Sequence, residues 1–375
     1  MTRARLAVIA LCAAGLALAG IAAGCSSAGV ANSPSLPPVR HVFVIVLENE
    51  NYSATFGPHP EAPYLAKKLT ARGQLLSNYY GTGHASLDNY ITMVSGQAAN
   101  TITQSDCQRY TNVTPGTIVA GGQALGQGCL YPSSVKTIAN QLGAKGLSWR
   151  GYMEDMGKDP ARESARCAHP ELGSTDPTQV ATRRDQYASR HNPFAYFHSI
   201  IDNKRSCRRH VVPLAFLRRD LAAAKRTPNF SFITPDLCHD GHDANCADPK
   251  EPGGFDGIDQ FLRQWVPRIR SAPAFRRNGL LIITFDESGS DASSCCFTPS
   301  GPNSPLQGVY GPGGGKIGAV LLSRWIKPGS VNPHPYNHYS LLRSLEDIFG
   351  VPPLGYAGQP GVQAFGKDVF NRYSR

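Results

Sequence analysis

The chain has 375 residues, of which 41% are hydrophobic and 17% charged, with a formal net charge of +10. This composition supports a large core, in one big domain or two smaller ones. The basic residues are scattered and form no dense Lys/Arg run, which argues against nucleic acid as a partner. The positive charge therefore indicates either a solvated basic surface or attraction for phosphorylated or other anionic substrates.

The first 24 residues have the pattern of an export signal. Arg3 and Arg5 precede an apolar run over 6–23, and small residues follow. Cys25 after Ala-Ala-Gly resembles a bacterial lipobox, although Ala22 stands where Leu is usual. We expect residues 1–24 to be a lipoprotein-type signal peptide; a plain signal peptide and an uncleaved anchor are the alternatives.

Export implies a protein that is either secreted or held at the cell membrane by a lipid on Cys25. The Ser/Pro-rich residues 25–40 are expected to form a tether, and residues 41–375 a single domain. Removal of the leader takes away Arg3 and Arg5 and leaves a net charge of +8 (10 − 2).

Cysteine usage agrees with export. Beyond Cys12 and Cys25 an even number remains, which predicts disulfides in an oxidising compartment: Cys107, Cys129, Cys167, Cys207, Cys238, Cys246, Cys295 and Cys296. No CxxC pair is present, so a Cys-rich zinc site is not expected. Spacing suggests a Cys238–Cys246 bridge, whereas the adjacent Cys295 and Cys296 are expected to bond to different partners.

The hydrophobic pattern alternates between short apolar runs and amphipathic segments. Along the chain we expect a buried strand over 41–47 and further strands over 74–79, 147–153, 230–233, 279–285 and 317–322. Between them we expect helices over 63–72, from Ser86 to Gly96, and over 134–143, 214–226 and 257–271, with a last helix over 339–349. Polar stretches at about 98–130 and 154–213 are predicted to be insertions, the first held by a disulfide.

The stretch from Gly83 to Gly96 changes from small polar residues to an apolar helical pattern, and Ser86 falls at the change. A helix start offers free N–H groups and a partial positive charge, which suits phosphate. The alternative is that Ser86 only caps the helix.

Three buried strands end in polar clusters. Glu48 and Asn49 follow the first strand, Asp286 and Glu287 follow another, and the loop 236–243 carries Asp and His residues after a third. In a largely parallel sheet these clusters meet at one edge, where such folds bind ligands. Grouped carboxylate and amide oxygens require a cation and suit Mg²⁺, Ca²⁺ or Mn²⁺ better than Zn²⁺, although Zn²⁺ stays possible.

Histidines add candidates for proton transfer. His239 and His242 lie in the loop 236–243, which is either a second group of ligands and acid/base residues or a polar turn pinned by a disulfide. His84 lies two residues before Ser86, and His338 precedes the last helix.

These phrases together resemble the bacterial phosphoesterase family, which contains phospholipases C and acid phosphatases and lies within the alkaline-phosphatase superfamily. The resemblance runs from about residue 41 to 349 and is carried in order by the phrases at 46–49, 84–90, 235–243, 285–287 and 337–343. It implies an α/β fold with three layers, α/β/α, a largely parallel central sheet of the alkaline-phosphatase type, and disulfide-held loop insertions.

The resemblance also implies roles for individual residues. Ser86 matches the nucleophile, which is also a metal ligand. Four residues match the other metal ligands: Glu48, Asn49, Asp286 and Glu287. Asn89 matches a phosphate contact, and His239, His242 and His338 match His-bearing loops. Asp88 departs from the family, because many relatives have Pro there, and a carboxylate would repel phosphate unless it faces away.

We therefore expect a metal-dependent phosphoester hydrolase that forms a phosphoserine on Ser86, with His239 or His242 protonating the leaving oxygen and Asn89, His84 and His338 binding substrate. A phosphorylated small molecule or a phospholipid is the expected substrate. The short region after the last motif favours an acid-phosphatase-like phosphomonoesterase. A phosphodiesterase of phospholipase C type, or a non-catalytic surface lipoprotein that binds a ligand, is the alternative. A sulfatase is disfavoured by the absence of a Cys-x-Pro-x-Arg signal.

Overall fold

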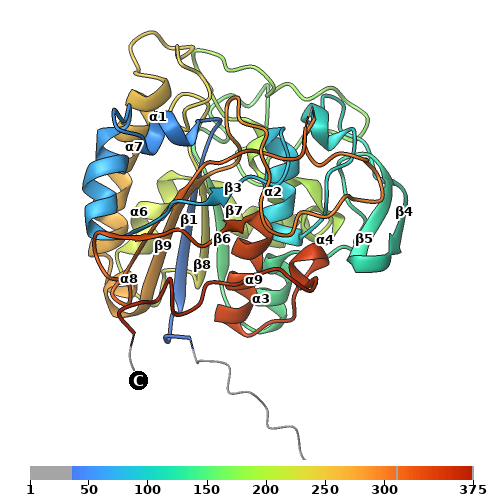
Figure 1. Ribbon diagram of the computed structural model, residues 1–375. Helices are drawn as coiled ribbons and strands as arrows, with labels where there is room; N and C mark the ends of the chain where they lie inside the picture. Colours follow the sequence, from blue (N-terminus) through green and yellow to red (C-terminus); the bar gives the residue numbers. More distant parts are fainter. Residues whose placement is uncertain (1–35, 310, 374–375) are drawn as a thin grey trace, which may run out of the picture. The chain divides into compact units, whose positions relative to one another are not determined.

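The computed structural model describes residues 36–309 and 311–373 (Figure 1). The predicted leader, the lipidation site Cys25 and most of the predicted tether lie outside this range. Leu36–Arg375 form one compact unit. Within the described residues, none of the helices has the length and apolar character needed to cross a membrane.

An eight-stranded sheet forms the centre of the molecule, in the order β11-β2-β10-β9-β1-β8-β6-β7. The central strands pair in parallel, whereas β10 runs antiparallel to both of its neighbours. The sheet strands are β1 His41–Leu47, β2 Gln74–Leu76, β6 Trp149–Met153, β7 Val211–Pro213, β8 Phe230–Thr234, β9 Gly279–Phe285, β10 Ala319–Ser323 and β11 Ser330–Asn332.

The apolar, β-branched composition of β1 and β9 explains their central place. Both strands are buried on both faces and pair in register from His41 with Gly279 to Leu47 with Phe285. A strand without polar alternation is stable only where helices cover both of its faces. The observed bounds of these two strands match the predicted ones.

Helices cover both faces of the sheet (Figure 1): α2, α3 and α9 lie on one side, and α7 and α8 on the other. The helices are α1 Tyr52–Phe56, α2 Ser86–Ser95, α3 Ile138–Ala144, α4 His198–Ile201, α5 Lys204–His210, α6 Ala215–Leu221, α7 Gly254–Ser271, α8 Pro273–Asn278 and α9 His338–Phe349, with a π-helical turn at Tyr64–Leu69. The predicted three-layer α/β/α arrangement with a largely parallel sheet is confirmed.

Local capping explains where several helices begin and end. α2 ends at Gly96, whose φ of 67° is the left-handed conformation that glycine adopts without strain. α3 begins later than predicted because Thr137 and Asn140 form a capping box at its start. The sequence pattern missed β7, α4, α5 and the hairpin of β4 Thr114–Val119 and β5 Gln123–Gln127, which are short or exposed.

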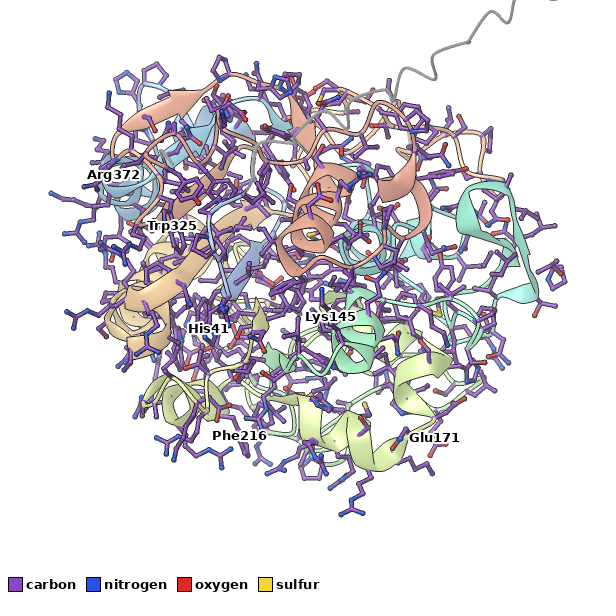
Figure 2. The ribbon with its side chains drawn as sticks, turned by 90° about the horizontal axis from the view of Figure 1, so that it is seen from below. His41, Lys145, Glu171, Phe216, Trp325 and Arg372 are labelled. Carbon is purple, nitrogen blue, oxygen red and sulfur yellow. A yellow bond between two sulfur atoms is a disulfide. The ribbon has the colours of Figure 1, made fainter. Side chains whose placement is uncertain are left out.

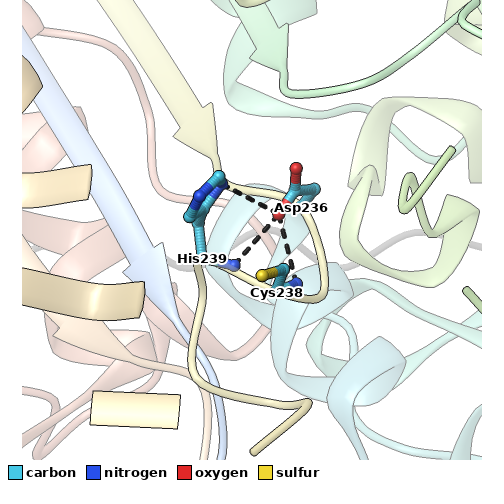
Figure 3. Close-up of side chains that lie close together, drawn as sticks. All are labelled: Asp236, Cys238 and His239. Atoms are coloured by element: carbon cyan, nitrogen blue, oxygen red, sulfur yellow. Dashed lines mark hydrogen bonds and ion pairs between the residues drawn. The ribbon is translucent and has the colours of Figure 1, made fainter. Parts of the chain in front are cut away.

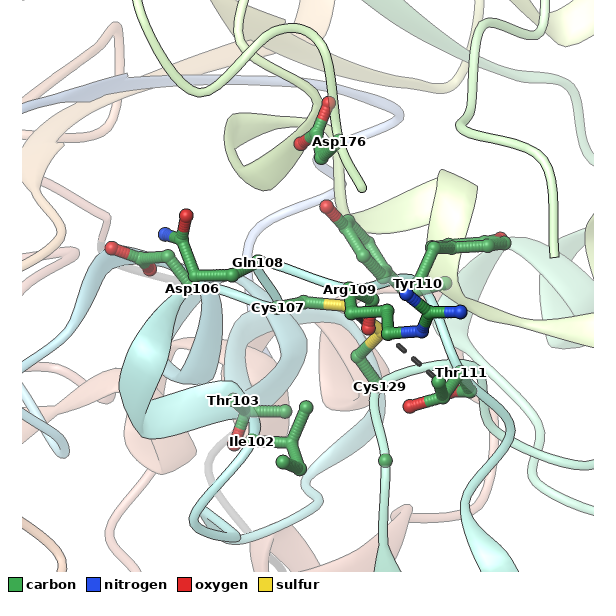
Figure 4. The surroundings of a disulfide bond; sticks show 12 residues. Ile102, Thr103, Asp106, Cys107, Gln108, Arg109, Tyr110, Thr111, Cys129 and Asp176 are labelled. Atoms are coloured by element: carbon green, nitrogen blue, oxygen red, sulfur yellow. Dashed lines mark hydrogen bonds between the residues drawn. A yellow bond between two sulfur atoms is a disulfide. The ribbon is translucent and has the colours of Figure 1, made fainter. Parts of the chain in front are cut away.

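The described residues contain four disulfides: Cys107–Cys129, Cys167–Cys207, Cys238–Cys246 and Cys295–Cys296. The first holds the insertion at 98–130, as predicted, and Figure 4 shows it next to Asp106. The suggested Cys238–Cys246 bridge is also confirmed. The expectation that Cys295 and Cys296 bond to different partners is wrong, because Cys296 has a φ of 61° that turns the chain and allows the neighbours to pair.

The carboxyl ends of β9, β1 and β8 lie together at one end of the sheet, at the top of Figure 1. Figure 2 looks at the opposite end, where His41 begins β1 and its Nδ1 lies 2.9 Å from the Pro228 carbonyl oxygen. The polar clusters predicted from the sequence therefore share one edge.

A buried carboxylate on α7 fastens the π-helical turn that follows α1. Asp259 accepts the N–H groups of Tyr64 (2.8 Å) and Leu65 (3.2 Å). We expect Asp259→Ala to lower the free energy of unfolding by about 1–3 kcal/mol in urea titrations, because these buried donors lose their acceptor. Asp256→Ala, an exposed change in the first turn of α7, is the control and should cost less than about 1 kcal/mol. Equal losses in the two variants would contradict this role.

Candidate active site

The edge of the sheet brings three acidic segments into contact. Glu48 follows β1, and its N–H donates to the Asp240 carbonyl in the loop after β8 (2.8 Å). Asp286 follows β9, and its Oδ1 accepts the N–H of Asn49 (3.3 Å). These backbone contacts hold the three loops together, so the carboxylates face one another as predicted.

Ser86 begins α2 and points into this cluster. It is 2% exposed, and its Oγ donates to Glu48 Oε2 at 2.8 Å. The residue before the helix is Ala85, and the N–H of Leu87 is satisfied by Asp106 Oδ1 (2.9 Å). The alternative that Ser86 only caps the helix is therefore wrong: its hydroxyl is engaged with a carboxylate.

Asn89 holds the loop that precedes Ser86. Its Oδ1 accepts the N–H groups of Thr82 and Gly83, both at 2.9 Å. Its Nδ2 donates to the carbonyls of Gly83 (2.9 Å) and Ala85 (3.1 Å). Both ends of the amide are thus used within the loop, so Asn89 shapes the Ser86 turn. The predicted phosphate contact of Asn89 would require some of these bonds to break.

Glu48 is the centre of the cluster. Besides Ser86, Tyr90 donates its hydroxyl to Glu48 Oε1 at 2.5 Å. Burial raises the pKa of Glu48 well above its usual range, and the charges of Asp286 and Asp240 add to the effect. Burial also raises the pKa of Asp286 to about 6. Negative charge is therefore crowded here, and it is stabilised by hydrogen bonds or by a cation.

The predicted metal ligands fit a cation. Asp286 Oδ2 and Glu287 Oε2 are buried and have no hydrogen-bond partner among the described residues. In one orientation of the Asn49 amide, its NH₂ group donates to Glu48 Oε2 (3.3 Å) and Asp286 Oδ1 (3.1 Å). Turned the other way, its oxygen joins these two carboxylate oxygens, which is the arrangement a divalent cation requires.

His191, which the sequence reasoning missed, completes a tight group with Glu48 and Asp240. Its Nε2 lies 3.2 Å from Glu48 Oε2 and its Nδ1 lies 3.1 Å from Asp240 Oδ2. The buried ring stacks on Tyr90 with centroids 5.3 Å apart, and burial lowers its pKa well below the usual value. His191 comes from the predicted insertion at 154–213, where nothing in the spacing connects it to the strand ends.

The two histidines predicted as proton donors lie in different surroundings. His242 lies beside the Ser86 cluster: its ring is 6.0 Å from that of His191, and its Nε2 is 3.2 Å from Arg190 Nη2. His239 instead lies 3.1 Å from Asp236 and 3.2 Å from Glu154 (Figure 3).

His239 stays protonated at neutral pH. Burial opposes its charge, but hydrogen bonds to Asp236 and Glu154 outweigh this and raise the pKa of His239 to about 11. Its Nδ1 proton is held between carboxylates, so His239 stabilises this loop and is poorly suited to protonate a leaving group. Cys238 lies beside it but is bound in a disulfide and offers no thiolate. Asp236, Cys238 and His239 therefore do not form a three-residue metal site.

The chain is similar in sequence to a known family of proteins. The model of the Phosphoesterase family matches residues 59–352. The chain belongs to the Phosphoesterase family. It is 25% identical over 316 residues to an acid phosphatase of Aspergillus fumigatus, covering 84% of this chain and 55% of that protein.

A second relative matches over nearly its whole length. The chain is 25% identical over 352 residues to a phosphatidylinositol-3-phosphatase of Mycobacterium tuberculosis, covering 94% of this chain and 90% of the relative. Among solved structures, a protein of the alkaline phosphatase superfamily from Vibrio parahaemolyticus has a TM-score of 0.48 and 11% identity, covering 90% of this chain and 73% of that one. The chain spans 55% of the length of the Aspergillus fumigatus acid phosphatase and 55% of that of a phosphate-repressible acid phosphatase of Penicillium chrysogenum.

Two further histidines were expected to bind substrate. His338 is fully buried, with Nδ1 3.1 Å from the Tyr79 hydroxyl and Nε2 2.6 Å from the Asp286 carbonyl, and burial lowers its pKa to about 4. Both ring nitrogens are engaged, so His338 positions the end of β9, and its predicted contact with substrate would require some of these bonds to break. His84 is half-buried, and its Nδ1 lies 3.2 Å from the Gly313 carbonyl.

Asp88 packs against the Ser86 loop and is shielded from solvent. Its carboxylate lies so close to the Gly83 Cα that any side chain at that position would collide with it. Burial raises the pKa of Asp88 well above its usual range, and Asp106 and Asp286 add to the shift.

The hydrogen bonds of Asn89 are open to a direct test. We expect Asn89→Ala to speed amide hydrogen exchange at Thr82 and Gly83 by about 10-fold or more, because both amides lose their acceptor. Asn78→Ala is the control, since Asn78 donates only to the Pro333 carbonyl and should leave these amides unchanged. Unchanged exchange in Asn89→Ala would show that the loop is held by other contacts.

Proposed function

We propose that this chain hydrolyses phosphoesters, with Ser86 as the nucleophile. The observation that carries the proposal is the bond from Ser86 Oγ to Glu48 Oε2 at 2.8 Å, at the start of a helix and inside a group of buried carboxylates. A structural serine does not need this surrounding. Membership of the Phosphoesterase family and the fungal relatives named acid phosphatase support the same reaction class.

The reaction proceeds in two displacements. Ser86 Oγ attacks phosphorus, its proton passes to Glu48 Oε2, and the bond from phosphorus to the leaving oxygen breaks. We assign protonation of that oxygen to His242, whose Nε2 would first exchange its contact with Arg190 Nη2 (3.2 Å) for the leaving oxygen. Water then attacks the phosphoserine and gives a proton to His242, the Ser86 oxygen leaves and takes back the proton held by Glu48, and inorganic phosphate is released from a monoester.

Metal dependence is part of the proposal. Glu48, Asn49, Asp286, Glu287 and Ser86 would hold a divalent cation. Oxygen ligands favour Mg²⁺, Ca²⁺ or Mn²⁺, whereas His191 beside Glu48 is a ligand type that Zn²⁺ also takes. When bound, such a cation lowers the pKa of a coordinated hydroxyl and neutralises charge on the phosphoryl oxygens.

A phosphomonoester is the proposed substrate, either a small molecule or a phospholipid with a terminal phosphate. The relative that matches over most of its length is named for removal of such a phosphate from phosphatidylinositol. The proposed location is outside the cytoplasm, secreted or anchored by a lipid on Cys25. The four disulfides support an oxidising compartment.

Hydrolysis of p-nitrophenyl phosphate tests the nucleophile. We expect Ser86→Ala to lower kcat by at least about 1,000-fold, because the attacking oxygen is lost. Ser95→Ala is the matched control, since Ser95 lies on the same helix and bonds only to the Ile91 carbonyl and the Gln97 N–H. A Ser86→Ala protein with the wild-type rate would exclude this nucleophile. Faster hydrolysis of bis(p-nitrophenyl) phosphate than of the monoester would instead indicate a phosphodiesterase, and hydrolysis of neither a binding lipoprotein.

Removal of metal tests the cofactor. We expect dialysis against a chelator to lower the rate at least about 100-fold, and one of Mg²⁺, Ca²⁺, Mn²⁺ or Zn²⁺ to restore it, because the clustered carboxylates need a cation to bind an anionic substrate. Elemental analysis of each preparation checks the metal content. Full activity in a metal-free sample would refute the metal role.

A further inference from the structure

Arg190 is unusual among the cationic side chains of this protein. It is 3% exposed, and within the described residues it is the one Lys or Arg that is buried. It forms no ion pair with a carboxylate in the described part of the chain, in contrast to Arg162, which pairs with Asp185 at 2.7 Å. The carboxylates of Asp106 and Asp240 are close enough to feel its charge but neither is at ion-pair distance, so the guanidinium keeps donors with which to bind an anion.

The guanidinium has donors to spare. Nη1 donates to the Gln179 carbonyl (3.1 Å), and Nη2 lies 3.2 Å from His242 Nε2. An arginine carries five N–H donors in a planar fork. These contacts fix the plane of the fork and leave the other N–H groups without a partner among the described residues.

Two observations place Arg190 near the cluster around Ser86. Along the chain it precedes His191, whose Nε2 is 3.2 Å from the Glu48 oxygen that accepts the Ser86 hydroxyl. Through space its charge acts on Asp106 and lowers the pKa of that group against the larger effect of burial. Asp106 in turn binds the N–H of Leu87, the residue after Ser86.

We propose that Arg190 is the phosphate-binding arginine of the Ser86 site and that it makes the enzyme selective for phosphomonoester dianions. This inference rests on the proposed function. Buried carboxylates surround Ser86, and they oppose any incoming anion. A cation placed beside them offsets that repulsion, and a guanidinium binds two phosphate oxygens at once.

The selectivity follows from the charge and shape of the two substrate classes. A monoester has three terminal oxygens and two negative charges near neutral pH. A diester has two terminal oxygens, one charge and a second bulky group. A two-oxygen contact with the guanidinium is open to both esters, so the selectivity comes from the second negative charge of the monoester and from the space that the second group of the diester needs.

The test compares kcat/KM for p-nitrophenyl phosphate and bis(p-nitrophenyl) phosphate in four proteins: wild type, Arg190→Met, Arg190→Lys and Arg183→Met. We expect Arg190→Met to lower the monoester value about 10- to 100-fold, largely through KM, and the diester value less than about 3-fold. Arg190→Lys keeps the charge without the fork and should fall between. Arg183→Met, an exposed change on the same insertion, should match wild type.

Each other outcome is decisive. Equal losses on both esters in Arg190→Lys, with circular dichroism unchanged, overturn the selectivity. If wild type hydrolyses neither ester, the proposed function fails, and calorimetry with inorganic phosphate then decides the anion site. Binding by wild type and a loss of about 10-fold or more in Arg190→Lys support the site, whereas equal affinities or no binding overturn it.

Discussion

The crowding of carboxylates at one edge of the sheet is the constraint on which the site depends. β9, β1 and β8 are parallel neighbours, so the acidic residues that follow them are brought close together. Burial and mutual repulsion raise the pKa of Glu48 well above its usual range. Such an arrangement persists only where hydrogen bonds, a cation or a positive side chain offset the charge. The Ser86 and Tyr90 hydroxyls supply the hydrogen bonds, and the proposed metal would supply the cation.

The Ser86 turn is built to serve that cluster. Ala85 is extended, Asn89 holds the preceding loop from within, and Asp106 takes the first free N–H of α2. The serine hydroxyl is thereby released from capping and turned towards Glu48. Gly83 is part of the same design, because only a residue without a side chain leaves room for the buried Asp88 carboxylate. Helix start and nucleophile position are one structural feature.

The insertions supply the histidine and arginine side chains that the acidic edge of the sheet lacks. The sheet edge is acidic, whereas the segment at 189–191 brings His191 between two carboxylates and Arg190 next to His242. Disulfides hold the flanking segments: Cys167–Cys207 encloses this turn, and Cys107–Cys129 anchors the loop with Asp106. In an exported protein these bridges restrict how far long surface segments can move from the active edge. We therefore expect these insertions, rather than the sheet, to decide substrate preference.

The sequence by itself determined the layers, the strands β1 and β9 to the residue, and the meeting of Glu48, Asn49, Asp286 and Ser86, because continuous apolar runs specify buried parallel strands whose carboxyl ends must coincide. It also singled out the histidines, but it could not rank them. His239 and His242 are three residues apart, yet only the folded loop turns one to Glu154 and the other to Arg190. His338 was assigned to the substrate, whereas in the fold it is buried and contacts Tyr79 and the Asp286 carbonyl. Arg190 and His191 were missed, because side chains from a polar insertion reach the sheet edge only through tertiary packing, which leaves no periodic signal in the chain.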